Sequence, residues 1–145
     1  MSDGTNYMKY AVIGVAGLGI GLVAWRNFGP SGEPGRSAQI VAPQQMSAAA
    51  SMGKKAFDGS CAQCHGVNAA GTEKGPPLIH DYYNPGHHAD GAFYTAVANG
   101  VRQHHWRFGN MPPQPQVTKD QLRMIIAYVR ELQAANGIGY KPHGQ

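Results

Sequence analysis

The sequence predicts a small all-α domain that follows a single N-terminal transmembrane helix. A long, uncharged apolar stretch near the N-terminus predicts the membrane helix, and apolar residues at helical spacing near the C-terminus predict the last helix of the domain. No segment shows the alternation of apolar and polar residues that is typical of a half-buried strand. Outside the membrane helix and a connecting segment, about 100 residues remain, which is enough for one small core.

The membrane helix is expected over residues 10–28, after a short cytoplasmic N-terminus of residues 1–9. The uncharged stretch itself runs from Tyr10 to Trp25 and has a basic residue on each side. A helix of this length spans roughly 24 Å, slightly less than the ~30 Å hydrocarbon core, so the flanking residues are expected to complete the span. A cleaved signal peptide is the alternative, but residues 22–27 offer no good small-x-small cleavage site, which favours an uncleaved anchor.

Residues 29–45 are predicted to be a flexible linker, because Gly, Pro and Ser are frequent there and bulky apolar residues are few. The folded domain is expected over residues 46–136, and residues 137–145 form a C-terminal tail. The 20 glycines, the 10 prolines and the low share of charged residues, 14%, indicate a loop-rich domain. A core of this size needs a further stabilising element.

Three helices are predicted in the domain from their caps and their apolar spacing. The first runs from Ser47 to Phe57, with Ser47 as its N-cap. The second has Asp90 as its cap and ends at Gly100. The third begins near Thr118, whose hydroxyl can start a capping box. Its predicted buried face comprises Leu122, Ile125, Ile126, Val129 and Leu132.

Both cysteines of the chain lie in the run Cys61-Ala62-Gln63-Cys64-His65. A Cys-x-x-Cys-His run is typical of a c-type haem attachment site. A thioredoxin-like dithiol would follow a strand, and a zinc site would need two further ligands at motif spacing; the sequence has neither. The motif therefore predicts one covalent haem c, attached through Cys61 and Cys64 and ligated by His65, and the haem would also add apolar surface to the core.

Residues 46–135 resemble the class I c-type cytochromes, in a membrane-anchored form with one haem. The run GKKAFDGSCAQCH is similar to the first helix and haem motif of that family, and Tyr128 in IIAYVREL is similar to an aromatic residue of its last helix. The resemblance implies a cytochrome c-like helical domain around the haem. It also implies that Gly53 lies where the first and last helices cross, with Phe57 packed beside Tyr128.

The resemblance extends to two segments that concern the iron ligands. Gly75-Pro76-Pro77-Leu78 is similar to the segment whose proline carbonyl accepts a hydrogen bond from the ligand histidine, which implies this role for Pro76. Asn110-Met111-Pro112-Pro113 is similar to the methionine ligand loop, which makes Met111 the expected sixth ligand. Ligation by His and Met raises the reduction potential and leaves no open iron position, so it implies an electron carrier and not a haem enzyme such as a peroxidase.

Five histidines between the expected iron ligands depart from the ordinary pattern: His80, His87, His88, His104 and His105. In one interpretation they are solvated or bind the haem propionates, as Trp106 and Arg107 are also candidates to do. In the other, His87, His88, His104 and His105 form a second metal site, with copper as the candidate ion. A histidine that replaced Met111 on the iron would lower the potential.

Two functions follow as expectations. In the first, the protein shuttles electrons between a quinol-oxidising complex of the cytochrome bc1 type and a terminal oxidase, as a single-pass protein of the bacterial inner membrane whose haem domain faces the periplasm. In the second, a copper-binding cytochrome takes part in copper handling or donates electrons to a copper enzyme.

The net charge of +4 fits docking to an acidic partner surface through Lys54, Lys55 and Lys74, although these lysines are equally explained by solubility. No basic run with interleaved aromatics indicates nucleic acid binding.

Overall fold

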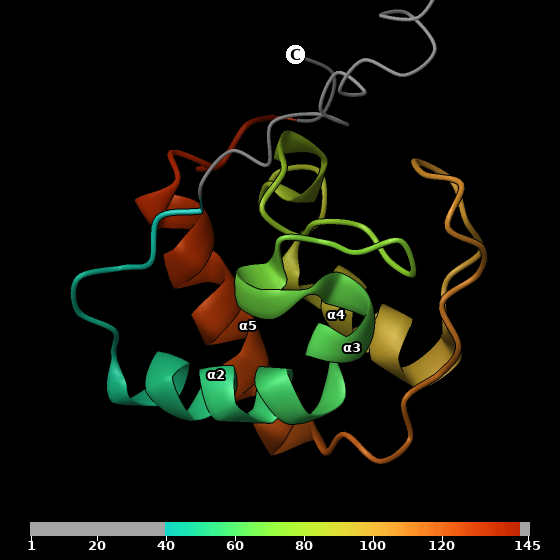
Figure 1. The fold of residues 1–145 in the computed structure, drawn as a ribbon, viewed down its shortest axis with the longest axis horizontal. Helices are drawn as coiled ribbons and strands as arrows, with labels where there is room; N and C mark the ends of the chain where they lie inside the picture. Colours follow the sequence, from blue (N-terminus) through green and yellow to red (C-terminus); the bar gives the residue numbers. More distant parts are fainter. Residues whose placement is uncertain (1–39, 143–145) are drawn as a thin grey trace, which may run out of the picture. The chain divides into compact units, whose positions relative to one another are not determined.

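The computed structural model describes residues 40–142, which form a helical domain without strands (Figure 1). The elements in chain order are α2 (Ala48–Ser60), α3 (Ala62–His65), η1 (Val67–Ala69), η2 (Asp81–Tyr83), α4 (Asp90–Asn99) and α5 (Lys119–Ala135), where η denotes a 3₁₀ helix. The predicted all-α fold of the domain is confirmed. The predicted membrane helix lies outside the described residues, and no helix within residues 40–142 has the length and apolar character needed to cross a bilayer.

Helices α2 and α5 cross, and this crossing is the main helix packing of the domain (Figure 1). Gly53 lies at the contact, where a Cβ atom would be 1.9 Å from the carbonyl oxygen of Met124. Only a residue without a side chain lets the two backbones approach this closely. The predicted role of Gly53 is therefore confirmed.

An aromatic pair packs beside this crossing. The rings of Phe57 and Tyr128 are tilted by 59° with centroids 5.5 Å apart, and both side chains are almost completely buried. Such tilted pairs add specific geometry to the burial of a large apolar area. The predicted contact between these two residues is confirmed.

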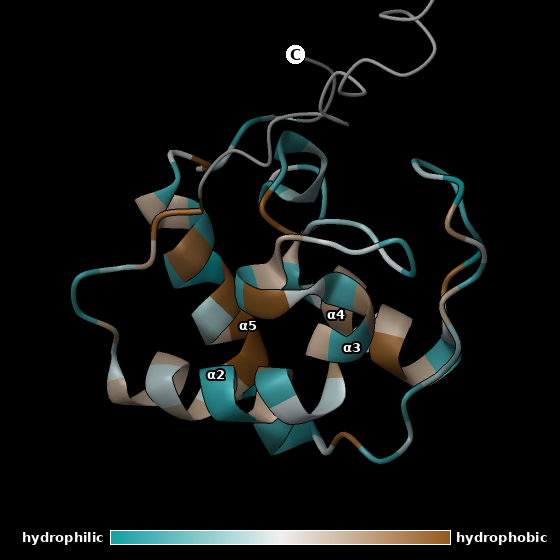
Figure 2. Cartoon of the chain, viewed as in Figure 1, coloured by the Kyte–Doolittle hydropathy of each residue, from teal (hydrophilic) through white to brown (hydrophobic). Residues whose placement is uncertain are grey.

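Both helices begin where the local sequence predicts. The Ser47 hydroxyl accepts a hydrogen bond from the backbone N–H of Ala50 at the start of α2. Thr118 and Gln121 form a reciprocal capping box at the start of α5. The predicted apolar face of α5, Leu122, Ile125, Ile126, Val129 and Leu132, is buried, and in Figure 2 apolar (brown) segments of α5 alternate with polar (teal) ones.

The start of α4 differs from the prediction. Its N-cap is Ala89, whereas Asp90 is the first helical residue and makes no cap hydrogen bond. The Asp90 carboxylate accepts a hydrogen bond from Nε of Arg130 at 2.9 Å instead, because the helix packs against α5. Gly100 ends the helix with a φ of 73°, which confirms the predicted end.

The loop before α4 is fastened to α5 by two polar residues. Gln133 is completely buried, and its Nε2 donates to the carbonyl oxygens of Leu78 and Tyr83, both at 2.9 Å. Arg130 donates to the carbonyl oxygens of Tyr83 and His88 and to Oε1 of Gln133. A buried network of this kind holds the loop in one conformation, since each broken bond would leave a buried polar group unpaired.

The last part of the predicted linker lies against the end of α5. The side chain of Asn136 donates to the carbonyl oxygen of Val41 and accepts from its N–H, each at 2.9 Å. Ile40 packs against the core. Residues 40–45 are thus attached to the domain, while residues 29–39 lie outside the described part of the chain.

Candidate haem site

A cavity of about 600 Å³ lies next to the Cys-x-x-Cys-His motif, a volume in the range of cofactor pockets. Its apolar wall is formed by side chains of α2, α4, α5 and the connecting loops, among them Phe57, Leu78, Phe93, Val97, Leu122 and Ile125. The fold brings six of the residues predicted for the haem site into the lining of this cavity: Cys61, Cys64, His65, Pro76, Trp106 and Met111. Segments more than 40 residues apart in the sequence therefore meet at one site.

His65 is fixed by its backbone partner. Its Nδ1 lies 2.9 Å from the carbonyl oxygen of Pro76. Because a carbonyl oxygen can only accept, Nδ1 carries the proton and the lone pair of Nε2 is left for a metal. Burial lowers the pKa of His65, although the bond to Pro76 works in the opposite direction, so the imidazole is held in the neutral form that a metal requires.

The two thiols are held close to the cavity by tight backbone packing. A Cβ atom at Gly75 would lie 2.9 Å from the carbonyl oxygen of Cys64, and the Thr72 hydroxyl donates to the same oxygen at 2.6 Å. Burial raises the pKa of the Cys61 thiol to about 11, and the neighbouring Cys64 adds to the rise. Dithiol oxidoreductases have a lowered thiol pKa, and Cys61 lacks this property.

Met111 is positioned by a backbone pairing. Its N–H and carbonyl group exchange two hydrogen bonds with Val101, both at 2.9 Å. Gly100 adopts a φ of 73°, and a Cβ atom there would lie 2.5 Å from the carbonyl oxygen of Met111. The methionine side chain is half-buried and lines the cavity, on a loop fixed at its base.

Trp106 lines the cavity and carries a hydrogen-bond donor, the N–H of its indole ring. Its Nε1 is buried and has no hydrogen-bond partner within the described residues. Burial raises the pKa of Tyr83 and the nearby indole partly offsets the rise, although the two groups do not form a hydrogen bond of standard geometry. A carboxylate such as a haem propionate would satisfy this N–H. Arg107 is exposed and does not line the cavity.

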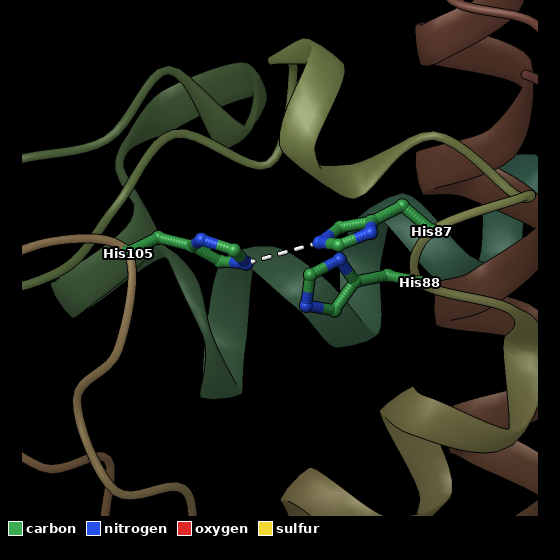
Figure 3. Close-up of side chains that lie close together, drawn as sticks. All are labelled: His87, His88 and His105. Carbon is green, nitrogen blue, oxygen red and sulfur yellow. Dashed lines mark hydrogen bonds between the residues drawn. The ribbon is translucent and has the colours of Figure 1, made fainter. Parts of the chain in front are cut away.

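The described histidines divide into different environments. One ring nitrogen from each of His87, His88 and His105 lies within 4.8 Å of the other two (Figure 3). His104 is outside this group: its ring packs on His105, with centroids 4.3 Å apart, and its Nδ1 lies 2.9 Å from the carbonyl oxygen of Arg102. His80 contacts Trp106, with ring centroids 5.0 Å apart.

Burial and close neighbours lower the pKa of two of these imidazoles, His88 and His105. Burial lowers the pKa of His88, and His87, His104 and Arg130 lower it further, against the opposing bond to the Tyr82 carbonyl. Burial and the neighbouring histidines also lower the pKa of His105.

Two residues that shape the site were not predicted from the sequence, namely Arg130 and Gln133. Both occur on α5 among apolar residues, where a polar residue is ordinarily expected to face solvent. Gln133 lies four residues after Val129 and seven after Ile126, so its spacing places it on the buried face of the helix. This spacing was the signal that could have found Gln133, whereas the unmatched carbonyl groups of a loop rich in Pro, Asn and Tyr indicated only that donors are needed.

Comparison with known proteins agrees with this arrangement. Residues 50–133 match the cytochrome c family, and the chain belongs to this family. It is 36% identical over 100 residues to the cbb3-type cytochrome c oxidase subunit FixP of Sinorhizobium medicae (strain WSM419) and to the same subunit of Rhizobium meliloti (strain 1021). The alignment covers 66% of this chain and 34% of each relative, so the chain spans about a third of the length of these curated relatives. No solved structure matches the chain significantly.

Family membership assigns a covalent haem c and a role in electron transfer to this chain. The residues of the cavity fit that group: paired thiols, an imidazole with a free lone pair, a thioether, apolar walls and a buried indole N–H.

Proposed function

We propose that this protein is a one-haem electron carrier in which His65 and Met111 are the axial ligands of the iron. The observation that carries the proposal is that both side chains line the same cavity as Cys61 and Cys64. Imidazole and thioether sulfur would together supply both protein ligands of the iron, which would leave no iron position for a substrate and would favour a high reduction potential.

The residues around the site support reversible one-electron transfer. When bound, the haem takes up and releases one electron. Pro76 holds the His65 ring in one orientation through the 2.9 Å bond, and the pairing with Val101 holds the loop of Met111. A site whose ligands are fixed in this way needs little rearrangement when its charge changes, and its apolar wall keeps water out.

We further propose that the protein passes electrons to a terminal oxidase, from a quinol-oxidising complex of the cytochrome bc1 type. The support is the similarity to proteins that are named as subunits of a cbb3-type cytochrome c oxidase. In this proposal the haem domain faces the periplasm, and residues 10–28 anchor it in the bacterial inner membrane.

The ligation is tested by the visible absorption of the oxidised protein. Sulfur bound to ferric haem gives a weak charge-transfer band in the red, so Met111→Leu should abolish this band and lower the reduction potential by on the order of 100 mV. Met52→Leu is the matched control, because Met52 is 55% exposed on α2 and does not line the cavity. An unchanged band in Met111→Leu would show that another group ligates the iron.

A further inference from the structure

Three histidines from two separate loops meet beside the haem cavity (Figure 3). His87 and His88 precede α4, and His105 follows it, so the helix between them brings the two loops together. We propose that His87, His88 and His105, the histidine triad, bind one divalent transition-metal ion in addition to the haem iron. This site is independent of the proposed ligation of the haem.

The spacing of two ring nitrogens is compatible with a tetrahedral ion. Nε2 of His87 and Nε2 of His105 lie 3.3 Å apart. Two nitrogens bound to Zn²⁺ at about 2.0–2.1 Å with a tetrahedral angle are themselves about 3.3–3.4 Å apart, whereas adjacent positions of a square plane would bring them to about 2.9 Å. The observed separation, which is that of the hydrogen bond between the two rings, is compatible with tetrahedral Zn²⁺.

The rings of the triad are oriented by neighbours that are not ligands. Nδ1 of His88 contacts the carbonyl oxygen of Tyr82, which requires a proton on Nδ1 and leaves the lone pair of Nε2 available. The ring of His105 stacks on the Tyr82 ring at an angle of 21°, with centroids 4.5 Å apart. Backbone carbonyls and packed rings of this kind are the usual supports of metal-bound histidines.

The loop that carries His87 and His88 is anchored to α5. Arg130 donates to the carbonyl oxygen of His88, and the guanidinium is paired with the Asp90 carboxylate at 2.9 Å. The pairing offsets the positive charge that would otherwise oppose a bound cation. The site is therefore built on a fixed loop, which lowers the cost of ordering the ligands when a metal binds.

The donor set defines the class of ion. Three imidazoles without a thiolate or a carboxylate suit Zn²⁺, Cu²⁺ and Ni²⁺, and exclude Ca²⁺ and Mg²⁺, which prefer oxygen ligands. Three protein ligands leave the fourth tetrahedral position to water. His104 lies outside the group that can reach one ion, so the four-histidine site expected from the sequence is reduced to three ligands.

The test is a titration of the full-length, haem-loaded protein with Zn²⁺ by isothermal calorimetry. We expect one equivalent to bind, and we expect His87→Ala and His105→Ala each to weaken binding by about 100-fold or more, since loss of even an outer-shell partner costs 10–100-fold. His104→Ala is the matched control, because it removes the neighbouring imidazole and should leave the affinity within a few-fold. The haem absorption spectrum of each variant reports whether the fold and the iron ligation persist.

Three outcomes would overturn the assignment. They are binding of several equivalents, equal loss in His104→Ala and His105→Ala, or affinities that do not differ between the parent protein and the two triad variants. Tighter Cu²⁺ binding by itself is expected from the general affinity order, so X-ray absorption of the Zn²⁺ form provides the test of geometry, with three imidazoles and one oxygen as the expected shell.

The site would be coupled to the haem, because His88 and His105 also line the haem cavity. A bound cation near the haem favours the reduced state, which carries one less positive charge, so Zn²⁺ should raise the reduction potential. By linkage, the reduced protein should bind Zn²⁺ more tightly than the oxidised protein by the corresponding factor. A potential that Zn²⁺ does not change, or changes equally in His87→Ala, would contradict the coupling.

Discussion

Tyr128 connects the packing of the domain with its behaviour at high pH. The side chain is 1% exposed, and its hydroxyl donates to Oδ1 of Asn68 at 3.3 Å. Burial raises the pKa of Tyr128 to about 12, and the charge of Asp58 adds to the rise. A tyrosine of the unfolded chain loses its proton near pH 10.

Between these two pH values the folded state binds one more proton than the unfolded state, so stability must fall as the pH rises. We expect Tyr128 to account for a loss of about 1.4 kcal/mol of unfolding free energy between pH 9 and pH 11, which is one pKa unit. Denaturant titrations at the two pH values should show this loss in the parent protein and not in Tyr128→Phe. An equal loss in both proteins would assign it to other groups.

At the scale of single residues, the sequence predicted the groups that belong to a contiguous motif and missed those that act across the fold. Cys61, Cys64 and His65 are adjacent in the chain, so their chemistry can be read directly. Arg130 and Gln133 act on carbonyl groups 42 to 55 residues away. Nothing in their local sequence indicates which backbone groups lack partners.

At the scale of helices, the starts of α2 and α5 were predictable because caps are local features, whereas α2 runs three residues beyond its predicted end at Phe57. Ser47 and the Thr118–Gln121 box satisfy backbone groups only three residues away. The N-cap of α4 was predicted wrongly because the acidic side chain of Asp90 has a distant partner, Arg130. The loops between helices depend on contacts around the cavity and could not be derived from local propensity.

The crossing of α2 and α5 gives a prediction for this scale. Gly53→Ala places a methyl group 1.9 Å from a backbone oxygen of Met124, which side-chain movement cannot relieve. We expect a loss of about 3 kcal/mol or more, at the upper end of overpacking effects. Gly59→Ala is the matched control, because a Cβ atom at this position of the same helix has nothing within 4 Å.

Gly59→Ala should leave stability unchanged or raise it by up to about 1 kcal/mol through helix propensity. Chemical denaturation of the haem-loaded proteins, followed by haem absorption and circular dichroism, measures both changes. Similar stability of the two variants would show that α2 and α5 can move apart without cost. That result would contradict the close contact at Gly53.

At the scale of the whole molecule, the charge distribution limits what the sequence alone could predict. The net charge of +4 was evident, but its placement was not. Of the three lysines expected near the haem, Lys54 is paired with Asp58 at 2.6 Å, whereas Lys74 is exposed and lines the cavity. Lys74 is thus the lysine best placed to meet a redox partner at the cavity rim.

Charge reversal at this rim gives the last prediction. If a terminal oxidase presents an acidic surface, Lys74→Glu should slow the second-order rate of oxidation by membranes that contain a cbb3-type oxidase, by about 3–10-fold at low ionic strength. Lys119→Glu makes the same charge change at an exposed residue outside the cavity lining and should have a much smaller effect. The difference between the two variants should shrink at 1 M salt, where the Debye length is only about 3 Å. Stopped-flow measurements over a salt series provide the rates. A rate that is independent of salt in all three proteins would mean that Lys74 does not steer docking.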